Sequence, residues 1–321
     1  MIIVVMGTGP FAAPTFEALY GTTHTVAALV TQPLRSAKGK GPPPNPMREI
    51  AAAHGTPILD PESINTPEAR AELARFQPDI FMVADYGQIL SAETLGVARL
   101  GGINLHGSLL PKYRGAAPIN WALYHGESEA GVTVIHMTPR IDAGPAIAQA
   151  KLTIDANDDA VSLEKRLAAL GAPLVCATLD RLAAGPVDAL PQDQTLATPA
   201  RRLRKTDGEV NWTRSAVQIR NQVRAFEPWP RTSVHLQRAG AADAAPIRLI
   251  LGRVTARLSA GARMSGEVAA VGREELIVAT GDGCLSLDEV QPAGKRMMAV
   301  AEFLRGHRVE VGDRFVPVPA P

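Results

Sequence analysis

The chain has 321 residues, of which 46% are hydrophobic and 20% charged, and these values are typical of a globular protein with two domains. Its apolar opening, Met1–Met6, is too short for a signal peptide and lacks the basic flank, and no apolar run is expected to reach membrane-spanning length. The two cysteines, Cys176 and Cys284, fit no metal or disulfide spacing, which predicts a cytoplasmic protein without a metal site.

The chain opens with an apolar run that ends in a glycine turn. A helical pattern follows over Phe11–Tyr20, so a strand, a turn and a helix are predicted, as at the start of a doubly wound α/β fold. A dinucleotide-binding motif would carry a third glycine where this chain has Ala12. The turn is therefore interpreted as packing geometry.

A basic loop rich in glycine and proline follows over residues 31–46. Its prolines exclude a regular helix or a central strand, and its length favours a functional loop. Arg35, Lys38 and Lys40 are candidates for phosphate contacts. A solvated loop without a ligand is an equally good interpretation of the local sequence.

The rest of the first half alternates predicted strands with predicted helices. The strands are Thr25–Thr31, Ile80–Ala84, Gly102–His106, Val132–Met137 and Ala146–Leu152. The helices are Met47–His54, Thr66–Phe76, Pro118–Tyr124 and Ala160–Ala184. This alternation predicts a doubly wound α/β domain with a mostly parallel sheet, whose ligands bind beyond the carboxyl ends of the strands.

The predicted strand Gly102–His106 carries the candidate chemistry. Apolar residues alternate with Asn104 and His106, so the carboxamide and the imidazole lie on the same side of the strand. Asp142, in a later loop, adds a carboxylate or is a turn residue. Asn, His and Asp without a serine or cysteine nucleophile indicate direct acyl transfer to an amine, in which the enzyme holds an oxyanion and moves protons.

The second half begins after Gly185–Thr198, a stretch that is typical of a linker. A helix is predicted at Ser215–Phe226. Short strands separated by glycines are predicted at Thr232–Leu236, Ile247–Val254, Gly266–Val271, Leu276–Thr280, Cys284–Val290 and Arg314–Val318. This pattern predicts a small β-barrel of the OB type.

The small net charge of +1 conceals an asymmetry. Residues 201–321 carry 19 Lys and Arg against 13 Asp and Glu, whereas the first 200 residues carry 14 against 19. A basic C-terminal half favours a polyanionic partner such as nucleic acid. Solvated surface charge explains the asymmetry equally well when charge is considered alone.

Four segments resemble a known family. The segment from Asn104 to Gly115, together with Asp142, is similar to the one that folate-dependent formyltransferases share. The segments Asp207–Trp212, Arg224–Pro230 and Gln291–Lys295 resemble the tRNA-specific members and not the shorter purine-pathway relatives. Along nearly its whole length, the chain resembles the bacterial methionyl-tRNA formyltransferases.

The resemblance implies a Rossmann-like formyltransferase domain at 1–185, a linker at 186–203 and an OB-like tRNA-binding domain at 204–321. It implies formyl transfer from 10-formyltetrahydrofolate to the amino group of initiator methionyl-tRNA, for translation initiation. A monomer without a membrane partner is expected.

The resemblance also implies residue roles. The catalytic residues are Asn104, His106 and Asp142; the folate contacts are Tyr86, Ser108, Leu109, Leu110 and Pro111; the tRNA contacts are Arg35, Lys38, Lys40, Arg204 and Lys205. Asn104 and a protonated His106 would donate hydrogen bonds to the oxyanion. Asp142 would orient His106 or take a proton from the ammonium group.

The chain departs from the family pattern at three places. Asp85 stands where alanine is more frequent, Gly9-Pro10 displaces a proline by one position, and Lys38 replaces an arginine and its planar five-donor group.

Two alternative functions stay open. One is a folate formyltransferase that acts on an amino sugar nucleotide or on glycinamide ribonucleotide, and the basic C-terminal half and the 31–46 loop argue against it. The other is a catalytically inactive RNA-binding protein, which the intact Asn104, His106 and Asp142 disfavour.

Overall fold

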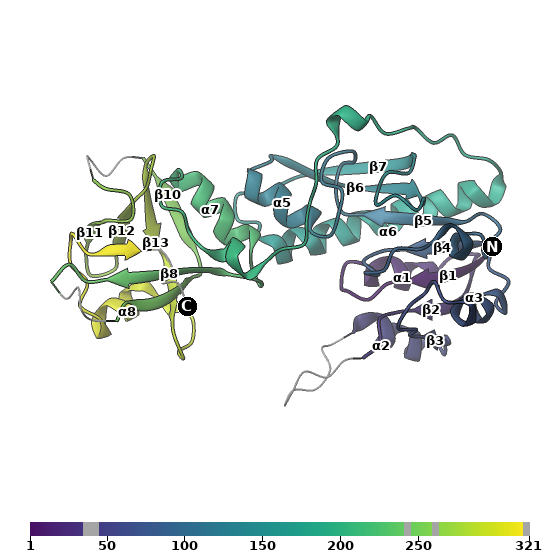
Figure 1. Cartoon of the computed structure of the whole chain (residues 1–321), viewed down its shortest axis with the longest axis horizontal. Coiled ribbons are helices and arrows are strands. Elements are labelled where there is room, and N and C mark those ends of the chain that lie inside the picture. Colours follow the sequence, from purple (N-terminus) through teal and green to yellow (C-terminus); the bar gives the residue numbers. More distant parts are fainter. Residues whose placement is uncertain (35–44, 241–244, 259–262, 317–321) are drawn as a thin grey trace. The chain divides into compact units, whose positions relative to one another are not determined.

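A computed structural model describes residues 1–34, 45–240, 245–258 and 263–316, which form two compact units (Figure 1). The first unit comprises Met1–Ile119, Ser128–Asp155 and Ser162–Arg202, and the second comprises Asn120–Glu127, Ala156–Val161 and Leu203–Pro321. Two short segments of the N-terminal half thus group with the second unit. The contiguous boundaries at 185 and 204 stay a prediction.

The first unit is built on a seven-stranded sheet in the order β3-β2-β1-β4-β5-β6-β7. Its strands are β1 (Ile2–Met6), β2 (Thr25–Val30), β3 (Ile58–Leu59), β4 (Ile80–Val83), β5 (Gly102–His106), β6 (Glu129–His136) and β7 (Ala146–Thr153). The pairs from β3 to β5 are parallel, whereas β5–β6 and β6–β7 are antiparallel. The predicted mostly parallel sheet is confirmed, with an antiparallel edge that the sequence did not indicate.

The described residues of this half form six helices, which are α1 (Ala13–Leu19), α2 (Pro46–Ala53), α3 (Pro67–Ala74), α4 (Ala92–Leu95), α5 (Pro118–His125) and α6 (Ala160–Ala184). Three of them, α2, α3 and α4, begin at a residue whose side chain caps the helix. The Asn45 side chain accepts hydrogen bonds at the start of α2, and Thr66 and Ser91 do the same for α3 and α4. Proline in the first turn of α2 and α3 completes these starts.

The helix α6 corrects one expectation. It has 25 residues and, within the described part of the chain, is the one helix long and apolar enough to cross a membrane by length and composition. The expectation that no apolar run reaches that length was therefore wrong. The helix buries Leu163, Leu167 and Leu179 completely, which is the behaviour of a core helix.

The second unit contains two antiparallel sheets, in the orders β10-β13-β12-β11 and β15-β14-β9-β8-β16. The strands are β8 (Thr232–Gln237), β9 (Ile247–Leu251), β10 (Val254–Arg257), β11 (Val268–Val271), β12 (Leu276–Ala279), β13 (Cys284–Leu287), β14 (Glu289–Pro292), β15 (Met298–Ala299) and β16 (Arg314–Val316). Two helices, α7 (Ala216–Ala225) and α8 (Val300–Gly306), accompany them, with short 3-10 turns η1 (Gln194–Leu196) and η2 (Lys205–Gly208) in the preceding segment. The predicted barrel-like domain is confirmed, and its OB type stays a prediction.

Two predicted strands in this unit are each two strands. The run Ile247–Val254 divides into β9 and β10, and Cys284–Val290 divides into β13 and β14, with the members of each pair in different sheets. The first division falls at Gly252, where a Cβ atom would lie 2.8 Å from the Met297 sulfur. Such corners let one apolar run serve both sheets, which is how orthogonal sheets share a core.

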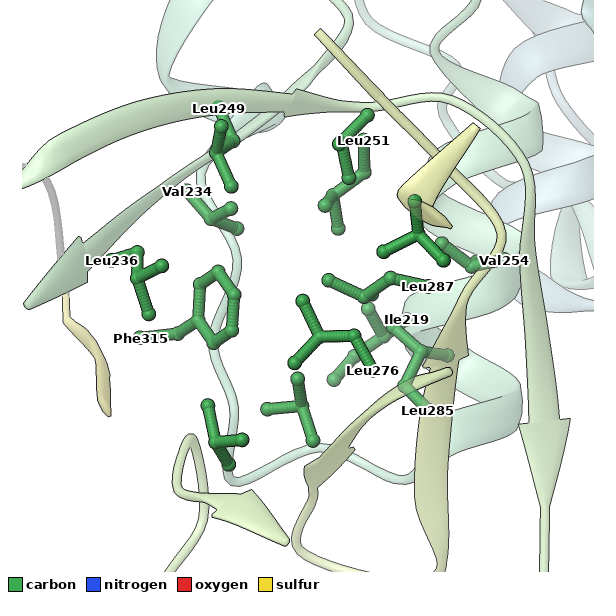
Figure 2. Packing of buried hydrophobic residues seen from close by; sticks show 14 of the residues in the cluster. Ile219, Val234, Leu236, Leu249, Leu251, Val254, Leu276, Leu285, Leu287 and Phe315 are labelled. Carbon is green, nitrogen blue, oxygen red and sulfur yellow. The ribbon is translucent and has the colours of Figure 1, made fainter. Parts of the chain in front are cut away.

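The core of the second unit lies between these sheets (Figure 2). This core contains Ile219 of α7, Leu249 and Leu251 of β9, and Leu285 and Leu287 of β13, all at most 1% exposed. In Figure 2, Ile219 lies beside Leu285 and Leu287. The α5 segment groups with this unit because the rings of Trp121 and Tyr124 contact Phe226. Apolar residues at alternate strand positions thus create the core that the sequence pattern indicated.

Leu285→Ala should destabilise the second unit by about 2–5 kcal/mol, because the leucine is fully buried and a cavity replaces it. Leu258→Ala is the matched control, since Leu258 is 96% exposed and its loss should change stability by less than ~0.5 kcal/mol. Urea unfolding followed by fluorescence measures both variants. Equal stability of the two would contradict the core assignment.

Candidate active site

The structure brings Asn104, His106 and Asp142 together on one face of β5. Strand alternation turns the side chains of Asn104 and His106 to the same side. The Asn104 Nδ2 atom lies 3.4 Å from Asp142 Oδ1, and the His106 Nδ1 atom lies 3.5 Å from Asp142 Oδ2. The His106 side chain is 6% exposed and that of Asp142 14%, so the carboxylate and the imidazole face each other with little water between them.

Asp142 reaches this position from the loop between β6 and β7. Because β6 runs antiparallel to β5, with Ile103 beside His136, this loop leaves from the amino end of β5 and must return along it. A Cβ atom at Gly144 would lie 1.7 Å from the His136 carbonyl oxygen, so only glycine permits this close return. Asp142 itself has φ 47°, a left-handed conformation that aspartate tolerates.

Both ring nitrogens of His106 have protein neighbours. The Nε2 atom lies 2.8 Å from the carbonyl oxygen of Tyr113. A carbonyl only accepts hydrogen bonds, so Nε2 carries a hydrogen and Nδ1 is the ring atom that faces Asp142. This arrangement differs from the expected oxyanion role of His106, because its Nε2–H is engaged, and leaves the Asn104 amide as the available donor.

The segment from Ser108 to Pro111 forms a tightly bonded turn. The Ser108 hydroxyl donates to the Lys112 carbonyl at 2.7 Å, and the Leu110 N–H donates to the Thr133 hydroxyl at 3.1 Å. Thr133 in turn donates to the Ser108 carbonyl at 2.6 Å. Ser108 and Leu110 are buried, whereas Leu109 and Pro111 are half-buried.

Tyr86 does not present its side chain to this site. It is 2% exposed and packs in the core with Phe81 and Leu90. Its hydroxyl has no hydrogen-bond partner among the described residues, and burial raises the pKa of that hydroxyl. The turn after β4 directs the Tyr86 ring inward, so its side chain is not placed for the predicted folate contact, and a contact through its backbone stays a prediction.

Asp85 and Gly9, two departures from the family pattern, contact each other. A Cβ atom at residue 9 would lie 1.9 Å from the Asp85 carboxylate, so Asp85 in this conformation requires glycine there. The Thr8 N–H also donates to the Asp85 carbonyl at 3.1 Å. Close packing on one side removes water and raises the pKa of Asp85 to about 6, although the side chain keeps solvent access on the other.

The predicted tRNA contacts are placed only in part. Arg35, Lys38 and Lys40 lie outside the described residues. Arg204 and Lys205 are exposed at the start of η2, where the Arg204 N–H donates to Asp207 Oδ2 at 2.7 Å. Across the described ranges, no three His, Cys, Asp or Glu side chains gather in a way that could hold a metal ion.

The sequence reasoning missed the residues that hold this site in place. The Gly115 N–H donates to Asp142 Oδ2 at 2.9 Å, and the Gln192 side chain donates to the Asp142 carbonyl at 2.9 Å. Gln192 lies in the stretch that was interpreted as a linker, and no periodicity or spacing in the sequence marks it. A polar residue in an irregular segment gives no signal until its partners are known.

Comparison with known proteins gives one consistent result. A family described as "Formyl transferase" matches residues 1–179, and one described as "Formyl transferase, C-terminal domain" matches residues 202–308. A protein of Geobacter sulfurreducens named methionyl-tRNA formyltransferase is 41% identical over 314 residues, 97% of this chain and 96% of that protein. A protein of the same name from Rhodopirellula baltica is 41% identical over 326 residues, with 98% and 96% covered.

Among solved structures, the N-formyltransferase of Helicobacter canadensis, in complex with folinic acid and dTDP-3-aminofucose, superposes with a TM-score of 0.65. It is 18% identical, and the match covers 91% of this chain and 100% of that one. At this identity the likeness supports the fold alone.

The Asp85→Asn variant should become more stable than the parent as pH rises through 6. The folded-state pKa of Asp85 is raised from 3.8 to about 6, so the ionised form is disfavoured in the folded protein. The parent therefore loses stability as pH rises from about 3.8 to about 6, and the loss is constant at higher pH, whereas asparagine carries no charge. Because the side chain keeps contact with water, the difference is smaller than for a fully buried carboxylate.

Asp79→Asn provides a control of opposite sign. The Ile2 N–H lowers the pKa of Asp79, so the parent's advantage over this variant is present at neutral pH and disappears as pH falls below 3.8. Thermal unfolding from pH 3 to pH 8 measures both variants. If the difference in melting temperature between Asp85→Asn and the parent stayed the same from pH 3 to pH 8, Asp85 would not titrate as described.

Proposed function

The chain belongs to the formyl transferase family and, within it, to the methionyl-tRNA formyltransferases, and we propose that Asn104, His106 and Asp142 carry the transfer. Enzymes of this group transfer a formyl group from formyltetrahydrofolate to the amino group of initiator methionyl-tRNA. The observation that supports the residue assignment is that the Asp142 carboxylate lies within 3.5 Å of both the Asn104 amide and the His106 imidazole, which β5 carries.

In the proposed mechanism, the Asn104 amide is the oxyanion donor. One hydrogen of Nδ2 points toward Asp142 and the other is free for the carbonyl oxygen of the formyl group. A donor of this kind, placed where negative charge develops, contributes ~3 kcal/mol to transition-state stabilisation. Because Asn104 sits on a central strand, its position costs no rearrangement during the reaction.

The Asp142–His106 pair is the proposed proton carrier. The α-amino group has a pKa near ~8, so part of it must lose a proton before its nitrogen attacks the formyl carbon. Asp142 accepts that proton, or passes it through His106 Nδ1, 3.5 Å away. The amine then adds to the formyl carbon and gives a tetrahedral intermediate, whose oxyanion accepts a hydrogen bond from Asn104. As the intermediate collapses, the bond to the folate nitrogen breaks and that nitrogen takes up one proton, while the other proton lost by the amine passes to solvent.

We further propose that the formyl donor is 10-formyltetrahydrofolate, held against the turn of Ser108, Leu109, Leu110 and Pro111. The turn fits this role because Thr133 and Lys112 fix its backbone, while Leu109 and Pro111 keep accessible apolar faces. We also propose a cytoplasmic monomer, and a reaction that uses no metal because amide and carboxylate groups suffice for it.

The proposed tRNA contacts are Arg35, Lys38, Lys40, Arg204 and Lys205. The excess of basic residues after position 200 supports them, and so does the match of the relatives across the C-terminal domain. A formylation assay with charged initiator and elongator tRNAs side by side tests the function itself. Absence of formylated initiator tRNA would overturn it.

Asn104→Ala and His106→Ala should each lower kcat by ~10²-fold or more while the affinity for tRNA stays within a factor of a few. Asp142→Asn should be similarly harmful, because it keeps the shape and removes the charge. Single-turnover formylation and tRNA binding measure these effects. His54→Ala is the control, since His54 lies against Tyr20 and Glu17, away from the three residues. Near-parental turnover of any trio variant would contradict the assignment.

The affinity of the parent for tRNA should fall steeply with salt, because each neutralised phosphate releases counterions. Replacing both Arg204 and Lys205 by alanine should make the slope of log affinity against log salt shallower by about 1.5, as expected for two lost phosphate contacts. Lys151→Ala is the control, because Lys151 lies on β7 and pairs with Glu129 at 2.9 Å.

Parallel salt slopes for the parent and the double variant would remove Arg204 and Lys205 from the interface. A flat response of the parent, together with no formylation of charged tRNA, would favour an amino sugar nucleotide as the acceptor.

A further inference from the structure

We propose that Gln192 is a positioning residue of this active site, and that residues 190–200 act as a strap that holds the two loops around His106 in register. The two loops are residues 113–115 and 142–144. This inference rests on the proposed function of the trio. The strap lies between the ranges that match the two formyl transferase domains, 1–179 and 202–308.

Gln192 holds the Asp142 loop through both hydrogens of its amide. Its Nε2 atom donates to the Asp142 carbonyl at 2.9 Å and to the Gly144 carbonyl at 2.7 Å. Its Oε1 atom accepts from Arg114 Nε at 3.0 Å and from Arg114 Nη2 at 2.6 Å. One half-buried side chain thus joins the loop of Asp142 to the loop of Arg114 with four hydrogen bonds.

The far end of the strap holds the second loop. The Tyr113 N–H donates to the Thr198 hydroxyl at 2.9 Å, and the Arg114 N–H donates to the Thr198 carbonyl at 2.8 Å. The Ala200 N–H donates a hydrogen bond to the Arg114 carbonyl at 2.6 Å. These bonds make the strap a short strand-like partner of residues 113–115.

The near end of the strap is fixed to the central sheet of the first unit. The N–H of Leu190 donates to the carbonyl of Ala146, and the N–H of Ala146 donates to the carbonyl of Leu190, both at 2.8 Å. Ala146 begins β7, directly after the Asp142 loop. The strap therefore spans from the sheet, across the Asp142 loop, to the 113–115 loop.

The two loops supply the partners of the reacting groups. The 113–115 loop provides the Tyr113 carbonyl that faces His106 Nε2 and the Gly115 N–H that bonds the Asp142 carboxylate. The other loop carries Asp142 in a left-handed conformation that its own backbone does not favour. Displacement of either loop by about 1 Å changes the Asp142–His106 geometry, and such displacements cost rate much more than substrate affinity.

Gln192 acts on the trio through the backbone carbonyls of Asp142 and Gly144. Substitution of Gln192 by glutamate separates its acceptance of hydrogen bonds from Arg114 from its donation to the two carbonyls. The introduced side chain would keep oxygen acceptors for Arg114 and would place a carboxylate against two carbonyl oxygens, which repel it. Alanine removes both functions together.

The test compares Gln192→Ala and Gln192→Glu in the full chain, with charged initiator tRNA as substrate. Both should lower kcat at least tenfold, with the KM values for tRNA and folate within threefold of the parent. Gln194→Ala is the matched control within the strap. The Gln194 side chain accepts from Arg114 Nη1 at 2.8 Å and donates to the Gln192 carbonyl at 3.1 Å, but neither bond involves the Asp142 loop. The kcat of this variant should stay within twofold.

Thr198→Val provides a second, milder variant. It removes the acceptor of the Tyr113 N–H and keeps the backbone bonds of the strap, so kcat should fall about threefold to tenfold with thermal stability close to that of the parent. Parental kcat in Gln192→Glu would overturn the proposal, and so would equal losses in Gln192→Ala and Gln194→Ala or an unchanged Thr198→Val. A parent that formylates no methionyl-tRNA would instead refute the proposed function.

Discussion

The geometry of the site depends on one constraint, which is that the Asp142 carboxylate must meet β5 from a loop outside the sheet. Asn104 and His106 lie within the sheet, where strand alternation and the register of β5 with β4 and β6 fix the positions of both side chains. Asp142 has no neighbouring strand to fix its position. Its position comes from the close return at Gly144, from the Gly115 N–H and from the Gln192 amide.

This constraint explains why irregular segments carry so many of the decisive hydrogen bonds. The backbone of residues 113–115 faces the imidazole, the carboxylate and the strap at once. If the Asp142 carboxylate moved freely, His106 Nδ1 would lose its neighbouring acceptor in a site of low exposure. The sheet supplies rigidity for two of the three groups, and a network of side-chain and backbone bonds supplies it for the third.

Two departures from the family pattern, Gly9 and Asp85, arise together from packing between segments far apart in sequence, and Gly252 shows the same effect in the second unit. Gly9 and Asp85 look unrelated along the chain, yet the carboxylate occupies the space of a Cβ atom at residue 9. In the second unit, one apolar run can turn a corner and serve two sheets because Gly252 leaves room beside Met297. In both places a glycine is needed because a distant segment packs against it, and the sequence around the glycine does not reveal that contact.

Sequence alone determined the features that arise from periodicity and residue type. The bounds of β5 and α6 match their predicted ranges, and the mostly parallel sheet and the trio Asn104, His106 and Asp142 were recognised from pattern and resemblance. Tertiary structure decided the inward turn of the Tyr86 ring, the engagement of His106 Nε2 by Tyr113, and the strap with Gln192. Periodicity reports which face of an element is buried, because burial repeats along that element. It carries no information about which backbone carbonyl a single polar side chain meets, since that depends on how distant loops fold together.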